Sequence, residues 1–259
     1  NEDGNTVEMP GTPLGPVVIS FTDDMEGLEP NGWTHSAASG VDDWHYVTTE
    51  SHSATHSWFA SNPATVKDDR LVTPAIAITG AAELSFWHYY NVESGYDGCV
   101  LEISTDGGTN YADLGTAITQ NGYTGSIPTG YSNPLAGRQA WTGNSAAWQE
   151  VLVDLAAYQG QTVHLRFRIG TDSMIEDVGW YVDDVVISQS SACETSLEVD
   201  GDLNQDYDCN AVDAVILGNF LSACIQHGEG GFTAPLLKAD LDGSTGVDAI
   251  DLVLLLLML

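Results

Sequence analysis

Short apolar runs that alternate with turn residues dominate the first three-quarters of this 259-residue chain. Turn sequences such as Asp106-Gly107-Gly108 and Tyr158-Gln159-Gly160 separate the runs, and long helical periodicity is absent there. This pattern predicts a mainly β protein, in which residues 17–189 form a two-sheet antiparallel sandwich of jelly-roll type. The runs expected to form strands are Ala75–Ile78, Leu84–Tyr90, Val100–Ser104, Trp148–Val153, Val163–Ile169 and Trp180–Ser188.

The pattern changes at both ends of the chain. Residues 1–16 are rich in Pro and Gly and have little hydrophobic pattern, which predicts an extended arm. A Ser-rich connector over residues 190–198 leads into a small module over 199–259. The run Leu252–Leu259 is too short to span a bilayer. It is apolar on every face, so we expect it to be covered, either inside the small module or by another molecule.

The small module contains one acidic pattern twice. Oxygen-bearing side chains fall at positions 1, 3, 5, 9 and 12 of two twelve-residue segments, which is the spacing of a calcium-binding loop. An apolar segment expected to be helical follows each loop, Val212–Leu221 and Ile250–Leu259. We expect one Ca²⁺ in each loop, bound in the first by Asp202, Asn204, Asp206, Asp208, Asn210 and Asp213, and in the second by Asp240, Asp242, Ser244, Gly246, Asp248 and Asp251.

This duplication resembles the type I dockerin module, in which two calcium loops are each followed by a helix. The family has Asp at loop position 12, as here at Asp213 and Asp251, but it usually has Gly at position 6, where this chain has Tyr207 and Thr245. Dockerins bind a cohesin partner partly through loop positions 10 and 11. The resemblance therefore implies a small α-helical calcium-binding module that contacts its partner through Ala211, Val212, Ala249 and Ile250.

Residues 20–188 resemble the MAM-like jelly-roll domain at the C-terminus of secreted proteases of the immune inhibitor A type. Members of that family use the domain for adhesion, carbohydrate contact or packing against a catalytic partner. The segments that carry the resemblance include Phe21-Thr-Asp-Asp-Met-Glu-Gly27, Leu84-Ser-Phe-Trp-His-Tyr-Tyr90, Tyr96-Asp-Gly98 and Gly179-Trp-Tyr-Val-Asp-Asp-Val185. By position in the family, at least one further Ca²⁺ is implied in the sandwich, with Asp24, Glu26, Asp43, Asp69 and Asp184 as its ligands. The alternative is that these carboxylates are ordinary turn and edge residues.

The net charge of −31 disfavours several classes of partner, because such a surface repels phosphate backbones and anionic lipids. The chain begins without Met and without a signal-like apolar stretch, so we expect a processed, secreted protein. Four cysteines fit an oxidising compartment. A Cys193–Cys224 bridge is the favoured pairing, and Cys99 is expected to be a free thiol in the core.

Catalytic motifs are not evident. His52 and His56 lie in a polar segment that lacks the Glu of a helical zinc-protease motif, and neither a nucleophile elbow nor a phosphate loop is present. Nothing singles out a glycosidase pair among so many carboxylates. Trp87 and Trp180 are expected in the core, because they lie in apolar runs. Trp44, Trp58 and Trp141 are left as candidate surface platforms for a sugar.

These observations favour a secreted, non-enzymatic, calcium-binding protein that assembles with other copies of itself into an extracellular fibre or tube. In that hypothesis Val17-Val18-Ile19 pairs with the sheet edge of a neighbouring copy, and the terminal Leu run is covered by another subunit. The alternative is a cohesin-docking or carbohydrate-binding accessory region of a secreted hydrolase. A glycosidase or esterase on the same scaffold is a third hypothesis.

Overall fold

The computed structural model describes residues 14–27, 29 and 31–192, and residues 18–189 form one compact unit. The described chain is built from strands, and its two helices, η1 (Gly115–Ala117) and η2 (Ala156–Tyr158), are single 3-10 turns. The strands are β1 (Leu14–Asp23), β2 (Thr34–Ser39), β3 (His45–Val47), β4 (Ser57–Asn62), β5 (Lys67–Val72), β6 (Ile76–Ile78), β7 (Ala81–Asn91), β8 (Gly98–Ser104), β9 (Ala112–Asp113), β10 (Ile118–Gln120), β11 (Gly125–Ser126), β12 (Gln139–Ala140), β13 (Gln149–Asp154), β14 (Gln161–Thr171) and β15 (Asp177–Ala192).

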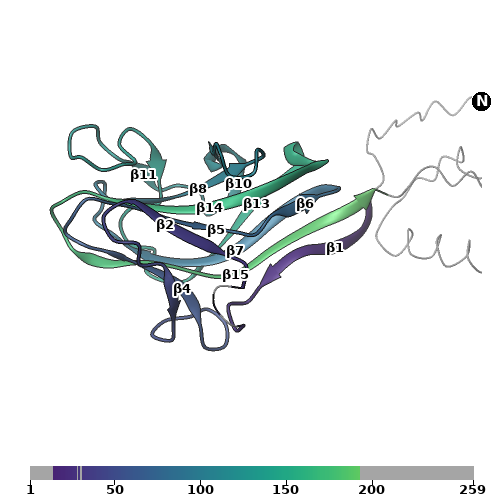
Figure 1. Ribbon diagram of the computed structural model, residues 1–259, viewed down its shortest axis with the longest axis horizontal. Helices are drawn as coiled ribbons and strands as arrows, with labels where there is room; N and C mark the ends of the chain where they lie inside the picture. Colours follow the sequence, from purple (N-terminus) through teal and green to yellow (C-terminus); the bar gives the residue numbers. More distant parts are fainter. Residues whose placement is uncertain (1–13, 28, 30, 193–259) are drawn as a thin grey trace, which may run out of the picture. The chain divides into compact units, whose positions relative to one another are not determined.

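Two sheets face each other in this unit (Figure 1). The first sheet has the order β10-β13-β7-β15-β4-β3, and β1 pairs with β15. The second has the order β2-β5-β14-β8-β9, and β6 pairs with β14. Strands β11 and β12 form a separate pair. The architecture confirms the predicted mainly β sandwich.

Alternation of side chains along each central strand builds the core. On β7, Leu84, Phe86, His88 and Tyr90 are buried, while the residues that alternate with them face outward and are partly exposed. The rings of Phe86 on β7 and Phe167 on β14 meet edge to face at 5.2 Å, which joins the two sheets. Cys99 is buried in this core as a free thiol, as predicted.

All six predicted strands are present, but the sequence pattern missed eight others, β2 to β5 and β9 to β12. The clearest case is β5, which begins Lys67-Asp68-Asp69; all three of these charged residues are buried. The tryptophan assignments were also partly wrong. Trp44, Trp58 and Trp141 are at most 1% exposed and belong to the core, so they are not surface platforms. Trp87 is half-buried and lies on the outer face of β7.

Several predictions concern residues outside the described part of the chain. These are the two acidic loops, their partner-binding positions, the helices after them and the Cys193–Cys224 bridge, which all stay predictions. The described residues contain no helix that is long and apolar enough to cross a membrane. Val17-Val18-Ile19 belongs to β1, which pairs with β15 of the same sheet, and its pairing with a neighbouring copy stays a prediction.

Candidate functional site

Two of the acidic residues predicted to bind calcium in the sandwich flank a buried lysine. The Lys67 ammonium donates to Asp43 and lies 3.3 Å from a carboxylate oxygen of Asp69. Ser61 also donates its hydroxyl to Asp43. Burial raises the pKa of Asp69 to about 6, whereas at Asp43 the hydrogen bonds from Lys67 and Ser61 outweigh burial and lower the pKa. In this arrangement the lysine supplies the positive charge beside both carboxylates.

The other predicted ligands lie near the loop between β3 and β4. Glu26 accepts hydrogen bonds from the backbone N–H groups of Thr55 and His56, at 2.8 and 2.7 Å. Asp184 accepts from His52 Nδ1 at 2.6 Å and from the Ser53 hydroxyl at 2.7 Å. The fold therefore brings Glu26, just after the first strand, and Asp184, on the last strand, to one loop. Asp24 accepts a local bond from the Glu26 backbone N–H, at 3.2 Å, and no bond from another segment of the described chain.

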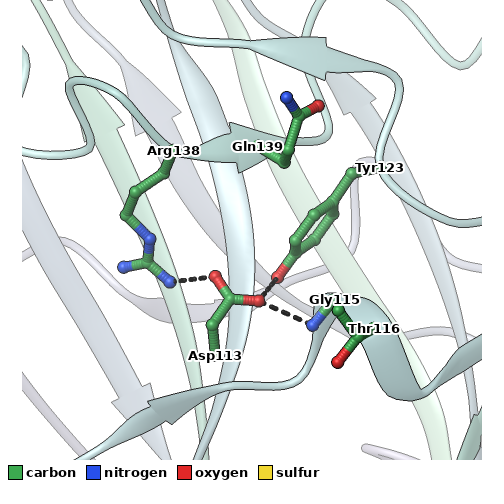
Figure 2. A pocket seen from close by; sticks show the side chains of 6 residues that line it. All are labelled: Asp113, Gly115, Thr116, Tyr123, Arg138 and Gln139. Atoms are coloured by element: carbon green, nitrogen blue, oxygen red, sulfur yellow. Dashed lines mark hydrogen bonds and ion pairs between the residues drawn. The ribbon is translucent and has the colours of Figure 1, made fainter.

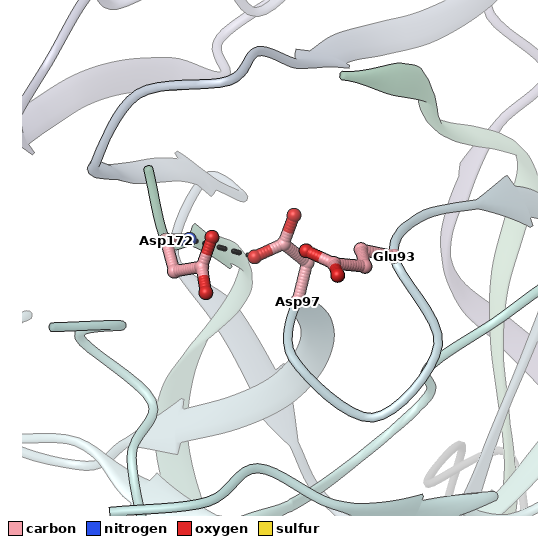
Figure 3. A group of neighbouring side chains, drawn as sticks. All are labelled: Glu93, Asp97 and Asp172. Carbon is pink, nitrogen blue, oxygen red and sulfur yellow. Dashed lines mark hydrogen bonds between the residues drawn. The ribbon is translucent and has the colours of Figure 1, made fainter. Parts of the chain in front are cut away.

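The structure also brings together an acidic group that the sequence reasoning missed. Glu93 and Asp97 from the β7–β8 loop meet Asp172, which directly follows β14 (Figure 3). One carboxylate oxygen of each residue lies within 4.8 Å of the other two. Asp97 is part of the Tyr96-Asp-Gly98 motif, so the motif marked its position without revealing its partners. This group is the candidate metal centre among the described residues.

A shallow cavity of about 580 Å³ opens beside η1 (Figure 2). Arg138 spans it, donating to Glu102 and to Asp113, both at 2.5 Å. Tyr123 directs its hydroxyl toward Asp113 at 3.3 Å, and the Gly115 N–H donates to the same carboxylate at 2.6 Å. Because Arg138 is paired with two carboxylates, the cavity offers little free charge for binding an anion.

The outer faces of the two sheets differ in chemistry. On the second sheet, Arg70 and Arg168 pair with Asp68, and Arg166 pairs with Glu102. That face is an ionic network whose charges are largely satisfied internally.

The first sheet carries aromatic side chains on its outer face. Tyr181 on β15 stands directly opposite Phe59 on β4, with ring centroids 4.5 Å apart. Tyr89 on β7 lies 5.8 Å from Tyr181, and Trp148, just before β13, lies 6.3 Å from both tyrosines. On the other side, His45 of β3 packs against Phe59 at 5.9 Å. We call Trp148, Tyr89, Tyr181, Phe59 and His45 the aromatic row.

The aromatic row crosses the sheet from β13 to β3, at right angles to the strands. Four gaps of about 4.8 Å between neighbouring strands make it roughly 19 Å long. Tyr181 in the middle is 7% exposed, whereas Phe59, Tyr89 and Trp148 are half-buried and His45 is exposed. A row of partly exposed rings on an open sheet face is a feature of binding surfaces rather than of solvated strands.

Polar groups from the β3–β4 loop hold part of this surface in place. The Trp148 indole N–H donates to Glu50 at 2.8 Å, and the exposed His52 ring stacks on Trp87 at 3.7 Å. Asp183 accepts the backbone N–H groups of His52 and Ser53 at 2.8 and 3.1 Å, and burial raises its pKa to about 6. The indoles of Trp87 and Trp148 are therefore fixed in orientation by neighbouring side chains.

The chain is similar in sequence to parts of two much longer proteins. Bacillopeptidase F of Bacillus subtilis (strain 168) is 25% identical over 187 residues, which are 69% of this chain and 11% of the relative. Hemagglutinin A of Porphyromonas gingivalis is 30% identical over 196 residues, 71% of this chain and 7% of the relative. The chain thus spans about a tenth of the length of these relatives.

Among solved structures, the K3 cleaved adhesin domain of Lys-gingipain from Porphyromonas gingivalis W83 superimposes with a TM-score of 0.43 at 21% identity. The match covers 67% of this chain and 99% of that domain. The model of the immune inhibitor A-like MAM domain matches residues 44–202, which is more than half of the chain. The chain therefore belongs to the immune inhibitor A-like MAM domain family.

Proposed function

We propose that this chain is a non-catalytic accessory module that works outside the cell and binds carbohydrate through the aromatic row. The observation that carries the proposal is the row itself, which places aromatic rings across five adjacent strands, three of them (Trp148, Tyr89 and Phe59) half-buried. The apolar C–H face of a sugar ring packs on aromatic faces, while nearby polar groups bind its hydroxyls.

The surroundings of the row support a sugar ligand over an apolar protein partner. Glu50 accepts the Trp148 indole N–H, Glu150 on β13 stands opposite Trp87 on β7, and the His45 and His52 rings are exposed on the same surface. Such a mixture of flat apolar surface and acceptors suits a polyhydroxylated chain. A roughly 19 Å row is long enough to contact several consecutive sugar units of one polymer.

The charge of the chain narrows the class of glycan. With a net charge of −31, the protein repels polyanions such as sulfated or uronic-acid polysaccharides. Within the described residues, the basic side chains lie in ion pairs. We therefore propose neutral polysaccharides as ligands.

The module at residues 199–259 lies outside the described residues, so its function is proposed from the sequence alone. We propose that the loops at 202–213 and 240–251 bind calcium and that residues 199–259 attach the sandwich to a cohesin-like partner; the duplicated acidic pattern supports this. Calcium at Asp24, Glu26, Asp43, Asp69 and Asp184 likewise stays a proposal. Self-assembly into a fibre stays a prediction, because residues 1–13 of the arm and the terminal Leu run lie outside the described residues. The family membership favours the accessory module.

Affinity electrophoresis of the full chain through gels that contain single polysaccharides tests the proposal. We expect retardation by at least one neutral polysaccharide (xylan, galactan, mannan or β-glucan) and none by heparin. Trp148→Ala and Tyr89→Ala should each weaken the retardation at least about tenfold, the loss of about 1.4 kcal/mol expected for a central contact residue.

Tyr111→Ala is the matched control, because Tyr111 is also half-buried but packs under Arg166, at 3.7 Å, on the other sheet. It should leave binding unchanged. Free migration of the wild type in every gel would argue against the carbohydrate proposal, as would equal loss of binding in Tyr111→Ala.

A further inference from the structure

The acidic group formed by Glu93, Asp97 and Asp172 lacks the positive charge that its burial requires. Asp97 and Asp172 are 0% and 1% exposed, and Glu93 is half-buried. Three carboxylates within 4.8 Å of one another repel strongly if all are ionised. Buried carboxylates in proteins are normally paired with a cation or a metal ion.

Both oxygens of Asp97 accept hydrogen bonds, whereas Asp172 and Glu93 are only partly satisfied. Asp97 accepts from Asn62 Nδ2 at 2.7 Å and from the Asp172 N–H at 2.6 Å. One oxygen of Asp172 accepts the Met174 N–H at 2.8 Å. The second oxygen of Asp172, Oδ2, and Glu93 Oε2 are buried and have no hydrogen-bond partner among the described residues. Figure 3 shows the three carboxylates converging on one another.

None of the basic side chains in the described part of the chain neutralises this group. Five of the six Lys and Arg residues lie there, and all five are engaged elsewhere. Lys67 pairs with Asp43 and Asp69, Arg70 and Arg168 with Asp68, and Arg138 and Arg166 with Glu102. The sixth, Lys238, lies outside the described residues.

We propose that Glu93, Asp97 and Asp172 bind a divalent cation, with calcium as the preferred ion. The donors are all oxygen atoms, which suits calcium, magnesium or manganese and disfavours zinc. Calcium lies about 2.3–2.6 Å from its ligands, so two ligands on opposite sides of one ion are at most about 5 Å apart. The 4.8 Å limit on the carboxylate oxygens fits within this distance.

The surrounding loops give the site a rigid frame. Asn62 at the end of β4 donates to Asp97 and accepts the Glu93 N–H at 3.3 Å, which holds both acidic residues of the β7–β8 loop. Asn133, 4% exposed, donates to the carbonyls of Tyr96 and Gly170 at 2.7 and 2.8 Å. The residues next to Asp97 and just before Asp172 are thus fixed. A bound ion would join the β7–β8 loop to the start of the β14–β15 loop.

The test compares the full chain with Asp172→Asn and Glu93→Gln, because other calcium sites are proposed in the same chain. Calcium bound per chain is counted by equilibrium dialysis followed by elemental analysis, and melting is followed with calcium or with excess chelator. Each variant should bind about one fewer ion than the wild type. Glu176→Gln is the control, because it removes an exposed carboxylate from the loop that follows Asp172.

The order of the melting temperatures of the wild type and the two amide variants should reverse between chelator and calcium. In chelator the two amide variants should melt at or above the wild-type temperature, since each removes one of three repelling charges. In calcium they should melt below it, because the wild type alone gains the ion. Glu93→Gln keeps the test decisive if Asp172→Asn does not fold, since Glu93 is only half-buried. The proposal would be overturned if Glu93→Gln bound as many calcium ions as the wild type and gained as much in melting temperature from calcium. Equal stabilisation by magnesium would overturn the preference for calcium.

Discussion

The buried lysine of β5 offers a sharp test of how this acidic chain tolerates charge in its core. Lys67 is 1% exposed and is paired with Asp43 and Asp69; it also donates to the Ser61 carbonyl at 2.9 Å. Replacing it in Lys67→Met keeps the apolar length of the side chain but leaves Asp69, which is 0% exposed, without its counter-ion. Breaking a buried pair in this way costs about 3–5 kcal/mol.

For a sandwich of this size, each kcal/mol lowers the melting temperature by about 2–4 °C, so we expect a fall of roughly 10 °C. Tryptophan fluorescence of the full chain reports this transition, because all seven tryptophans lie between residues 33 and 180. Adding Asp69→Asn to Lys67→Met should recover about half of the loss, since it removes the stranded charge. A loss below about 1 kcal/mol, typical of an exposed ion pair, would refute the reasoning.

Three further predictions follow from single sites. Burial raises the pKa of Asp97 and Asp183 to about 6. Both carboxyls ionise at about pH 4 in the unfolded chain but only at about pH 6 in the folded chain. In chelator the melting temperature should therefore fall as pH rises from about 4 to about 6, with no further loss from these groups above about pH 6. A melting temperature that rises over this window would contradict the prediction. Gly179→Ala should lower the free energy of unfolding in urea by more than about 2 kcal/mol. Gly179 has a φ of +127, and the new Cβ would lie only 2.2 Å from the Ala60 carbonyl oxygen. Gly160→Ala should lower the free energy of unfolding by only about 1–2 kcal/mol, because Gly160 has a φ of +80 but open space around it. Equal losses in the two variants would count against the steric argument. Cys99 is fully buried and its thiol pKa is raised, so it should react with a thiol reagent only on unfolding; rapid labelling of the native protein would contradict its place in the core.

The strand β14 could be predicted from its apolar inner face, whereas β5, with a charged inner face, could not. β14 presents Val163, Leu165, Phe167 and Ile169 to the core, so its alternation is visible in the sequence. β5 buries Lys67 and Asp69 instead, and only their mutual pairing makes that burial tolerable. The local sequence of β5 does not show that the fold will place Asp43 beside Lys67.

The same limit applies to the tryptophans and the candidate sites. Trp87 lies in an apolar run, but the two-residue period of β7 puts it outside, between buried Phe86 and His88. The aromatic row joins residues of five strands, and Asp172 meets Asp97 from 75 positions away. These contacts depend on strand order, which an apolar pattern alone does not specify.

The most direct test of the carbohydrate proposal is an NMR titration of the ¹⁵N-labelled full chain, followed at the tryptophan indole N–H signals. The ligand is an oligosaccharide from the polysaccharide that retards the protein most in affinity electrophoresis. The account predicts shifts of the half-buried Trp87 and Trp148 signals, assigned with Trp87→Phe and Trp148→Phe, and little change at the five buried indoles. Saturable binding that leaves both of these signals unmoved would contradict the claim that the aromatic row is the binding surface.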